Sequence, residues 1–147
     1  MGNRWRGDDA AGLAVAAAVG ARRPPGVEVV EHEGEPITLI EACEGAPALW
    51  IVDAVRSGAQ PGTLHRLDAA QQPLPAELFG VSTHRLGLAD ALELARALGR
   101  LPPQVIVYGI EANEFEPGSP LSPSVALAVE RLADALVEEL SAAVDAV

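Results

Sequence analysis

Residues 48–55, ALWIVDAV, form an almost unbroken apolar run. A strand that is covered by helices on both of its faces has this composition, because neither face meets water. Residues 104–110, QVIVYGI, have the same character. The two runs therefore predict two buried strands of an α/β protein, with residues 48–55 as a central strand of the sheet.

Helical patterns alternate with these strands along the chain. Two shorter runs rich in β-branched or alternating residues predict further strands at 27–33 and, nearer a sheet edge, at 63–68. Helices are expected at residues 12–23, 36–45, 88–99 and 122–144, the last with Ser122 as its cap and Pro123 in its first position. The alternation predicts one domain over residues 1–147, a three-layer α/β/α fold with a mostly parallel sheet.

The net charge of the chain limits the classes of partner that it is expected to bind. Acidic residues outnumber basic ones 21 to 10, which gives a formal net charge of −11. Nucleic acid and anionic lipid are bound chiefly by Lys and Arg, so neither is an expected partner. The excess charge either keeps a small protein soluble or faces a basic protein partner. With no signal peptide, no apolar stretch of about 20 residues and the single Cys43, we expect a cytoplasmic protein. We also expect a monomer.

Ligands of parallel α/β sheets sit beyond the carboxyl ends of the strands, so polar residues in those positions are of interest. Asp53 follows the apolar residues 50–52, where a carboxylate needs a partner or a cation unless it caps the following loop. His84 precedes the helix expected at 88–99, either as a site residue or as part of its cap. By contrast, His32 and His65 lie in alternating runs, where solvent-facing structural histidines are expected.

The first residues of the chain carry a third polar group. Gly2 and Gly7 have the spacing of a phosphate-binding loop, but Asp8 and Asp9 follow them and would repel a phosphate. Both acids suit a helix start, as cap and first-turn residue. Caps do not require the glycines, however, and Gly2, Gly7 and Gly12 indicate close approach by another backbone segment or by a substrate chain.

If these three loops converge, Asp9, Asp53 and His84 supply two carboxylates and an imidazole. This set suits a borderline divalent metal with open coordination positions. No serine or cysteine nucleophile arrangement is visible, and neither an H-E-x-x-H motif nor a cysteine cluster indicates a permanent zinc site.

Together these residues resemble the hydrogenase maturation proteases, endopeptidases that trim the C-terminal extension of the large subunit of nickel-iron hydrogenases once nickel is in place. The resemblance spans nearly the whole chain in order. Its motifs are Gly2-Asn3 with Gly7-Asp8-Asp9 and Gly12; Asp53-Ala54 with Gly58 and Pro61-Gly62-Thr63; Ser82-x-His84-x-Leu86-Gly87-Leu88; and Gly109-Ile110-Glu111 with Phe115, Gly118 and Leu121-Ser122-Pro123-x-Val125.

The resemblance implies that Asp9, Asp53 and His84 are the metal-contacting and catalytic residues, and that the nickel arrives with the large-subunit precursor rather than being held permanently. In one mechanism the metal polarises the scissile carbonyl or activates water, with a carboxylate as base. In another the metal is only a recognition tag, and Asp9 or Asp53 activates water as in aspartyl-type proteases. The alternatives to this protease are a noncatalytic nickel-site chaperone or binding module of hydrogenase assembly, and an unrelated hydrolase on the same scaffold.

One departure from the family pattern concerns the first strand. Relatives of this kind have an apolar strand that runs into the Gly-Asn pair, whereas here Met1 directly precedes Gly2. An unpaired inner strand position leaves backbone groups without partners. We therefore expect the natural product to start upstream of Met1 by roughly one strand, or about six to ten residues. The chain as given is expected to be poorly soluble or to dimerise, and to hold Asp9 loosely.

Overall fold

The computed structural model describes residues 1–33, 35–79 and 87–146 of the chain. Its elements follow one another in the order of a short 3-10 helix η1 (Gly7–Ala10), α1 (Ala11–Arg22), α2 (Pro36–Cys43), β1 (Ala48–Val55), β2 (Leu64–Asp68), α3 (Ala76–Phe79), α4 (Leu88–Ala97), β3 (Gln104–Glu111) and α5 (Pro123–Asp145).

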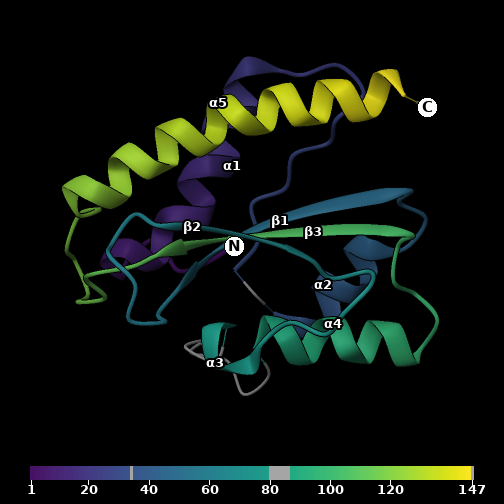
Figure 1. The fold of residues 1–147 in the computed structure, drawn as a ribbon, viewed down its shortest axis with the longest axis horizontal. Coiled ribbons are helices and arrows are strands. Elements are labelled where there is room, and N and C mark those ends of the chain that lie inside the picture. The colour runs from purple at the N-terminus through teal and green to yellow at the C-terminus, as the bar shows by residue number, and fades with distance from the viewer. Residues whose placement is uncertain (34, 80–86, 147) are drawn as a thin grey trace.

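Helices cover both faces of the sheet (Figure 1). On one face α1 and α5 pack against each other and against the strands, and on the other lie α2, α3 and α4. Each face has its own apolar cluster: Val15, Tyr108 and Leu132 belong to the first, and Ile51 and Leu92 to the second. The predicted three-layer α/β/α architecture is confirmed.

The sheet has the strand order β1-β3-β2 within the described residues. β1 runs parallel to β3, from Ala48 opposite Gln104 to Val55 opposite Glu111, while β2 runs antiparallel to β3. The sheet is therefore mixed. The edge position expected for the strand at 63–68 is confirmed by β2.

The expectation that residues 48–55 form a central strand is wrong for this sheet. β1 is a strand with the predicted bounds, but it lies at the edge, and β3 takes the centre. Every residue of β3 after Gln104 is buried, whereas the first three residues of β1 are only partly buried. An apolar run predicts burial, and helices that cover a strand can supply that burial without a strand on each side.

Residues 27–33 were expected to form a strand, and this prediction is wrong. The segment carries no regular structure. The backbone N–H of Gly2 donates to the carbonyl of His32 at 3.1 Å, but no ladder of such bonds continues along the segment. Val27 and Val29 pack against the α1/α5 cluster and Val30 is exposed. β-branched residues suit a strand, but a strand forms only where a neighbour pairs with its backbone.

The four predicted helices are confirmed as α1, α2, α4 and α5. Pro123 is the first residue of α5, where its missing N–H costs no hydrogen bond. Gly99 follows α4 with φ of +68°, a left-handed conformation that glycine adopts without a steric penalty. α3 was not expected, because its four residues are too few to show a helical period.

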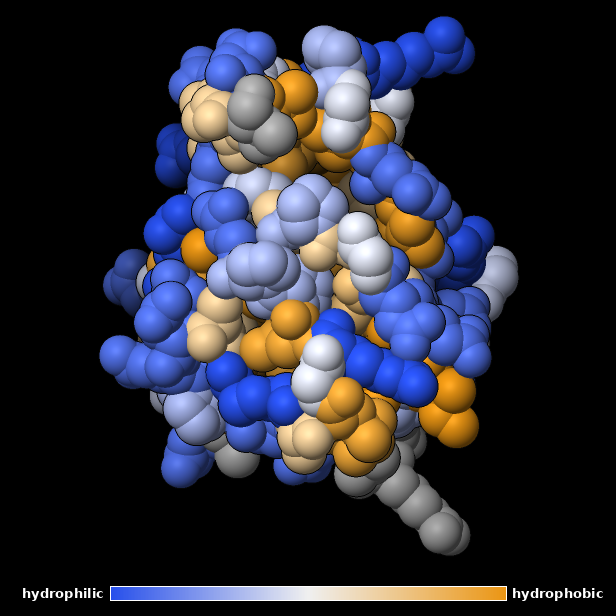
Figure 2. Space-filling model, turned by 90° about the vertical axis from the view of Figure 1, so that its right-hand side faces the viewer, coloured by the Kyte–Doolittle hydropathy of each residue, from blue (hydrophilic) through white to orange (hydrophobic). Residues whose placement is uncertain are grey.

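The surface at the right-hand side of Figure 1 is shown in Figure 2, where hydrophobic residues occur in small groups among hydrophilic ones. Such scattered apolar residues are normal for a protein surface and indicate no site by themselves. Of the helices in the part of the chain that the structure describes, none is long and apolar enough to cross a membrane.

Candidate functional site

Asp53 lies near the carboxyl end of β1, opposite Gly109 of β3. Side chains alternate between the faces of a strand, and Ile51 and Val55 belong to the cluster on the α2/α3/α4 face. Asp53 has the same parity, so its half-buried carboxyl points to that face. The position beyond a parallel strand pair is the one where α/β sheets bind their ligands.

The environment of Asp53 favours the protonated form of its carboxyl group. Burial raises the pKa of Asp53 to about 6; the ammonium group of Met1 and a 2.9 Å hydrogen bond from the N–H of Ala54 oppose this, whereas the negative charge of Asp9 adds to it. A carboxyl with this pKa exchanges its proton close to neutral pH, as general acid–base catalysis requires.

Asp9 lies in η1, directly before α1, and its charge acts on Asp53 although the two are far apart in sequence. Gly12 makes this approach possible. A Cβ atom at position 12 would lie 2.3 Å from the carbonyl oxygen of Val52, which no side chain tolerates. Glycine therefore lets the first turn of α1 touch β1 beside Asp53.

Gly2 and Gly7 also permit contact between backbone segments of this chain. Gly2 has φ of +139°, and a Cβ there would lie 1.8 Å from the carbonyl oxygen of Asp9. At Gly7, with φ of +54°, a Cβ would lie 2.6 Å from the carbonyl oxygen of Glu114. The predicted close approach is thus confirmed, and the approaching groups are other segments of the protein.

Asp8 has a different role from the helix cap that was expected. Its buried carboxylate accepts four hydrogen bonds of 2.8 Å, from the backbone N–H groups of Asn113, Glu114 and Ser122 and from the hydroxyl of Ser122. Ser122 is the N-cap residue of α5, as predicted, but its side chain makes no cap hydrogen bond, because the hydroxyl donates to Asp8. Burial would raise the pKa of Asp8, but these bonds hold it below its ordinary value.

Glu111 at the end of β3 is a second buried carboxylate, which belongs to one of the sequence motifs but was assigned no role from the sequence. It accepts hydrogen bonds from the N–H of Ser57 at 2.8 Å and the hydroxyl of Ser57 at 2.5 Å, and His65 Nε2 lies 3.2 Å away. Burial would raise the pKa of Glu111, but these contacts keep it low. A signal existed, since Glu111 follows an apolar run just as Asp53 does.

The serine, histidine and carboxylate around Glu111 do not form a nucleophilic triad. In such a triad the imidazole contacts the hydroxyl and the carboxylate contacts the imidazole. Here Ser57 and His65 both contact the carboxylate, whose low pKa makes it a poor base. The expectation that His65 is structural agrees with this contact, although its side chain is only 24% exposed. His32 lies 2.7 Å from the Thr38 hydroxyl on the surface.

His84 lies outside the described residues, so the structure brings together two of the three predicted site residues, Asp9 and Asp53. Among residues 1–33, 35–79 and 87–146, no group of three or more His, Cys, Asp or Glu side chains is arranged to hold a metal ion. A metal-contacting trio therefore depends on the segment that contains His84.

Aromatic and arginine side chains accompany the loops around this end of the sheet. The guanidinium of Arg56, just after β1, lies 4.6 Å from the ring centroid of Phe115, just after β3. Trp5 is 72% exposed, and its carbonyl accepts a 2.7 Å hydrogen bond from Gly118. The loops that precede η1 and follow β3 are thus held together beside Asp9.

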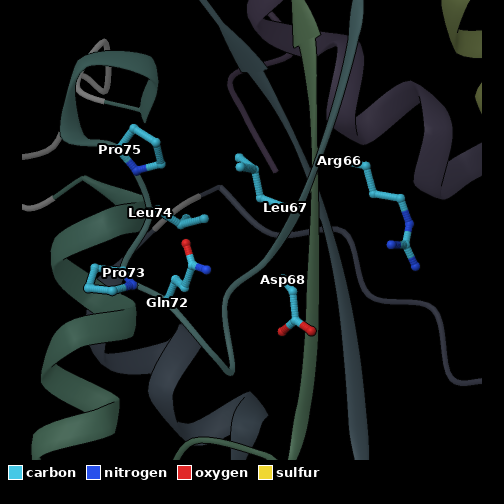
Figure 3. Close-up of a pocket in the computed structure, with 7 residues that line it drawn as sticks. All are labelled: Arg66, Leu67, Asp68, Gln72, Pro73, Leu74 and Pro75. Carbon is cyan, nitrogen blue, oxygen red and sulfur yellow. The ribbon is translucent and has the colours of Figure 1, made fainter.

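A small cavity lies elsewhere, toward the far end of β2. Figure 3 shows Arg66 and Leu67 on opposite sides of β2, and Asp68 near the segment of Gln72 to Pro75. Asp68 pairs with Ile106, three positions before the Gly109 that faces Asp53. The cavity therefore does not include the carboxylate pair, and we place the functional site at Asp9 and Asp53.

Comparison with known proteins adds an independent observation to this geometry. The family model described as hydrogenase maturation protease matches residues 15–139. The chain belongs to the hydrogenase maturation protease family. The match includes Asp53, His84 and Glu111, while Asp9 lies before it.

Relatives of this maturation protease chain include several solved structures. The hydrogenase maturating endopeptidase HybD from Escherichia coli has a TM-score of 0.80 and 26% sequence identity, with 97% of this chain and 89% of that chain covered. The hydrogenase 2 maturation protease of Escherichia coli is 30% identical over 134 residues, which cover 88% of this chain and 80% of the relative.

The hydrogenase expression/formation protein HoxM of Azotobacter vinelandii is 30% identical over 122 residues, or 77% of this chain. The chain spans 59% of that protein, and 58% and 46% of two further curated relatives. These relatives thus share the family domain with this chain but extend well beyond the part that matches.

Proposed function

We propose that the protein is an endopeptidase that removes the C-terminal extension of a nickel-iron hydrogenase large-subunit precursor after nickel insertion. The observation that carries this proposal is the approach of Asp9 to Asp53 beyond the carboxyl end of β1, in a chain of the hydrogenase maturation protease family. The protein acts in the cytoplasm as a monomer. The nickel ion that it recognises arrives with the precursor.

In this proposal Asp9, Asp53 and His84 face the nickel of the incoming precursor. Two carboxylates and an imidazole are ligands that suit nickel, and a site that needs the metal acts only on precursor that is already loaded. The raised pKa of Asp53 supports it as the group that accepts a proton from the attacking water.

The test is to incubate the purified protein with nickel-loaded and with nickel-free precursor, and to follow the mass of the large subunit. We expect the loaded precursor to shorten and the nickel-free precursor to stay intact. Asp9→Ala, Asp53→Asn and His84→Ala should each abolish the shortening. Cleavage of both precursors at the same rate, or wild-type rates in all three variants, would refute the assignment.

The same experiment separates a protease from a noncatalytic nickel-site chaperone. A chaperone would co-migrate with the loaded precursor and leave its mass unchanged. Elemental analysis of the purified protein adds a second control. We expect no stoichiometric zinc, and one tightly held zinc per chain would instead favour an ordinary metallopeptidase.

A further inference from the structure

Glu111 is a buried acidic residue on the α2/α3/α4 face of the sheet that the proposed chemistry leaves unused. Its side chain is 1% exposed. Its carboxylate accepts two hydrogen bonds from Ser57 and contacts His65. These donors hold the buried carboxylate in one orientation, because each hydrogen bond that is lost lowers the stability of the native state.

The backbone of Glu111 holds the other end of the same loop. Its carbonyl accepts a 2.8 Å hydrogen bond from the N–H of Gly62, and its own N–H donates to the carbonyl of Thr63 at 2.8 Å. Gly62 has φ of +88°, and a Cβ there would lie 2.7 Å from the carbonyl oxygen of Ser124, so the loop fits closely against the start of α5. Glu111 thus fastens both Ser57 and residues 62–63, the two ends of the loop between β1 and β2.

This loop follows directly from the strand end that carries Asp53. Val55 lies opposite Glu111 in the parallel ladder, and the N–H of Ala112 donates to the carbonyl of Val55 at 2.9 Å. Asp53 and Glu111 also share the α2/α3/α4 face by the alternation of their strands. A shift of the Glu111 carboxylate would therefore move the loop, the end of β1 and the Asp53 side chain together.

We propose that Glu111 is a positioning residue of the protease: through Ser57 it fixes the β1–β2 loop and so holds the Asp53 carboxyl group in place for the precursor. This inference rests on the proposed function for its effect on processing. Glu111 does not touch the substrate, and its contribution is the geometry of the strand end. Misplacement of a reacting group by about 1 Å costs on the order of 100-fold in rate.

Glu111→Gln is the informative change, because it keeps the size of the side chain but leaves one acceptor oxygen for the three donors. The matched control is Glu139→Gln. The carboxylate of Glu139 on α5 also has three donors, the side chains of Trp50, Arg66 and Tyr108, but it lies on the opposite face of the sheet. Both changes remove one acceptor oxygen from a carboxylate that has three hydrogen-bond donors. Only the Glu111 carboxylate is bonded to the loop that follows the strand of Asp53.

Three experiments should be done on both variants: urea unfolding for the free energy of unfolding, processing of nickel-loaded precursor for kcat and KM, and hydrogen exchange at the Ser57 and Gly62 amides. We expect comparable losses of stability in the two variants. Only Glu111→Gln should speed exchange at Ser57 and Gly62, and only it should lower kcat, by roughly 10- to 100-fold. Ser57→Ala should lower kcat in the same direction, and combining it with Glu111→Gln should give less than the product of the two effects.

Two results would overturn the inference. One is equal loss of kcat in Glu111→Gln and Glu139→Gln, which would reflect stability alone. The other is unchanged exchange of the loop amides in Glu111→Gln. Failure of the wild-type protein to process precursor would instead refute the proposed function, and with it any role of Glu111 in processing, while faster loop exchange would still establish Glu111 as the anchor of the loop.

Discussion

Asp8 and Asp53 are both buried or half-buried aspartates at the same end of the sheet, yet their surroundings act on them in opposite directions. Asp8 receives four hydrogen bonds, which hold its pKa below the ordinary value in spite of burial. Burial, with a smaller contribution from the charge of Asp9, raises the pKa of Asp53 to about 6, although the Met1 ammonium group and a hydrogen bond from Ala54 oppose the rise.

The difference in hydrogen bonding distinguishes a carboxylate that stabilises the structure, Asp8, from one that belongs to the candidate site, Asp53. A carboxylate that the protein satisfies with its own donors is part of the scaffold, because its charge already has partners. A carboxylate that is held in a half-buried place against another negative charge costs free energy in the folded protein. That cost is typical of functional sites, where it is recovered when a cation or a proton arrives.

The largest expected effect on the free energy of unfolding comes from removing the Asp8 carboxylate, which accepts four hydrogen bonds. Asp8→Ala leaves three backbone N–H groups and the Ser122 hydroxyl without their acceptor, each at a cost of about 1–3 kcal/mol, so we expect a loss of at least about 4 kcal/mol in the free energy of unfolding. Urea denaturation at pH 7 measures it. Asp134→Ala is the control, because this exposed aspartate pairs with Arg22 on the surface and should cost less than about 1 kcal/mol.

Asp53→Asn should have the opposite sign. At neutral pH the native protein holds a charged Asp53 whose pKa is raised from 3.8 to about 6, a shift of about 2 units that corresponds to at most about 3 kcal/mol of destabilisation. The neutral variant should be more stable by up to this amount above pH 6. The gain should fade as the pH falls from 6 to below 4, where the Asp53 carboxyl group becomes protonated in the folded and the unfolded wild type alike. A stability difference between the two that does not change with pH would contradict the assignment.

Asp8 should show the reverse dependence on pH. Because its pKa is lowered in the native protein, its contribution to stability is present above the ordinary pKa near 4 and is lost as the pH falls through its native value. Acid unfolding of the wild type should therefore be steeper than that of Asp8→Asn below pH 4. Parallel unfolding curves for the two proteins in this range would show that Asp8 does not carry a lowered pKa.

A smaller effect is expected at the link between the two site carboxylates. Asp9→Asn removes the negative charge that helps to raise the pKa of Asp53, so the titration midpoint of the Asp53 carboxyl carbon in NMR should move below about 6. Glu116→Gln, an exposed change in the loop after β3, should leave that midpoint where it is. An unchanged midpoint in Asp9→Asn would show that the two carboxylates do not interact.

The smallest effect is expected at His32. Its ring lies on the surface against Thr38, and the proposed chemistry gives it no role. His32→Ala should keep the stability of the wild type within about 0.5 kcal/mol and should process nickel-loaded precursor at the wild-type rate. A loss of processing would move the site toward the segment before α2.

Sequence patterns predicted the parts of this protein that depend on local chemistry. The apolar runs of β1 and β3 are strands with nearly the expected bounds. Asp9 and Asp53 were chosen as candidate site residues because one lies at the start of a predicted helix and the other near the end of a predicted strand. Residues 27–33 were misassigned because a strand requires a partner that the local pattern does not reveal. The roles of Asp8 and Glu111 were missed for a similar reason: their hydrogen-bond partners are 46 to 114 residues away along the chain. The prediction for His84 stays open, since it lies outside the described residues.

The hydrogen bonds of Asp8 have a consequence for the order in which the chain folds. They join residue 8 to residues 113, 114 and 122, so the opening loop cannot be fixed until most of the chain has left the ribosome. Contacts of such long sequence separation form late, because the entropy of closing the loop between them is lost before the contact is gained. β1 is paired with β3, residues 104–111, so the strand that carries Asp53 waits for nearly the same part of the chain as residue 8 does. The two carboxylates therefore meet only when synthesis is nearly complete.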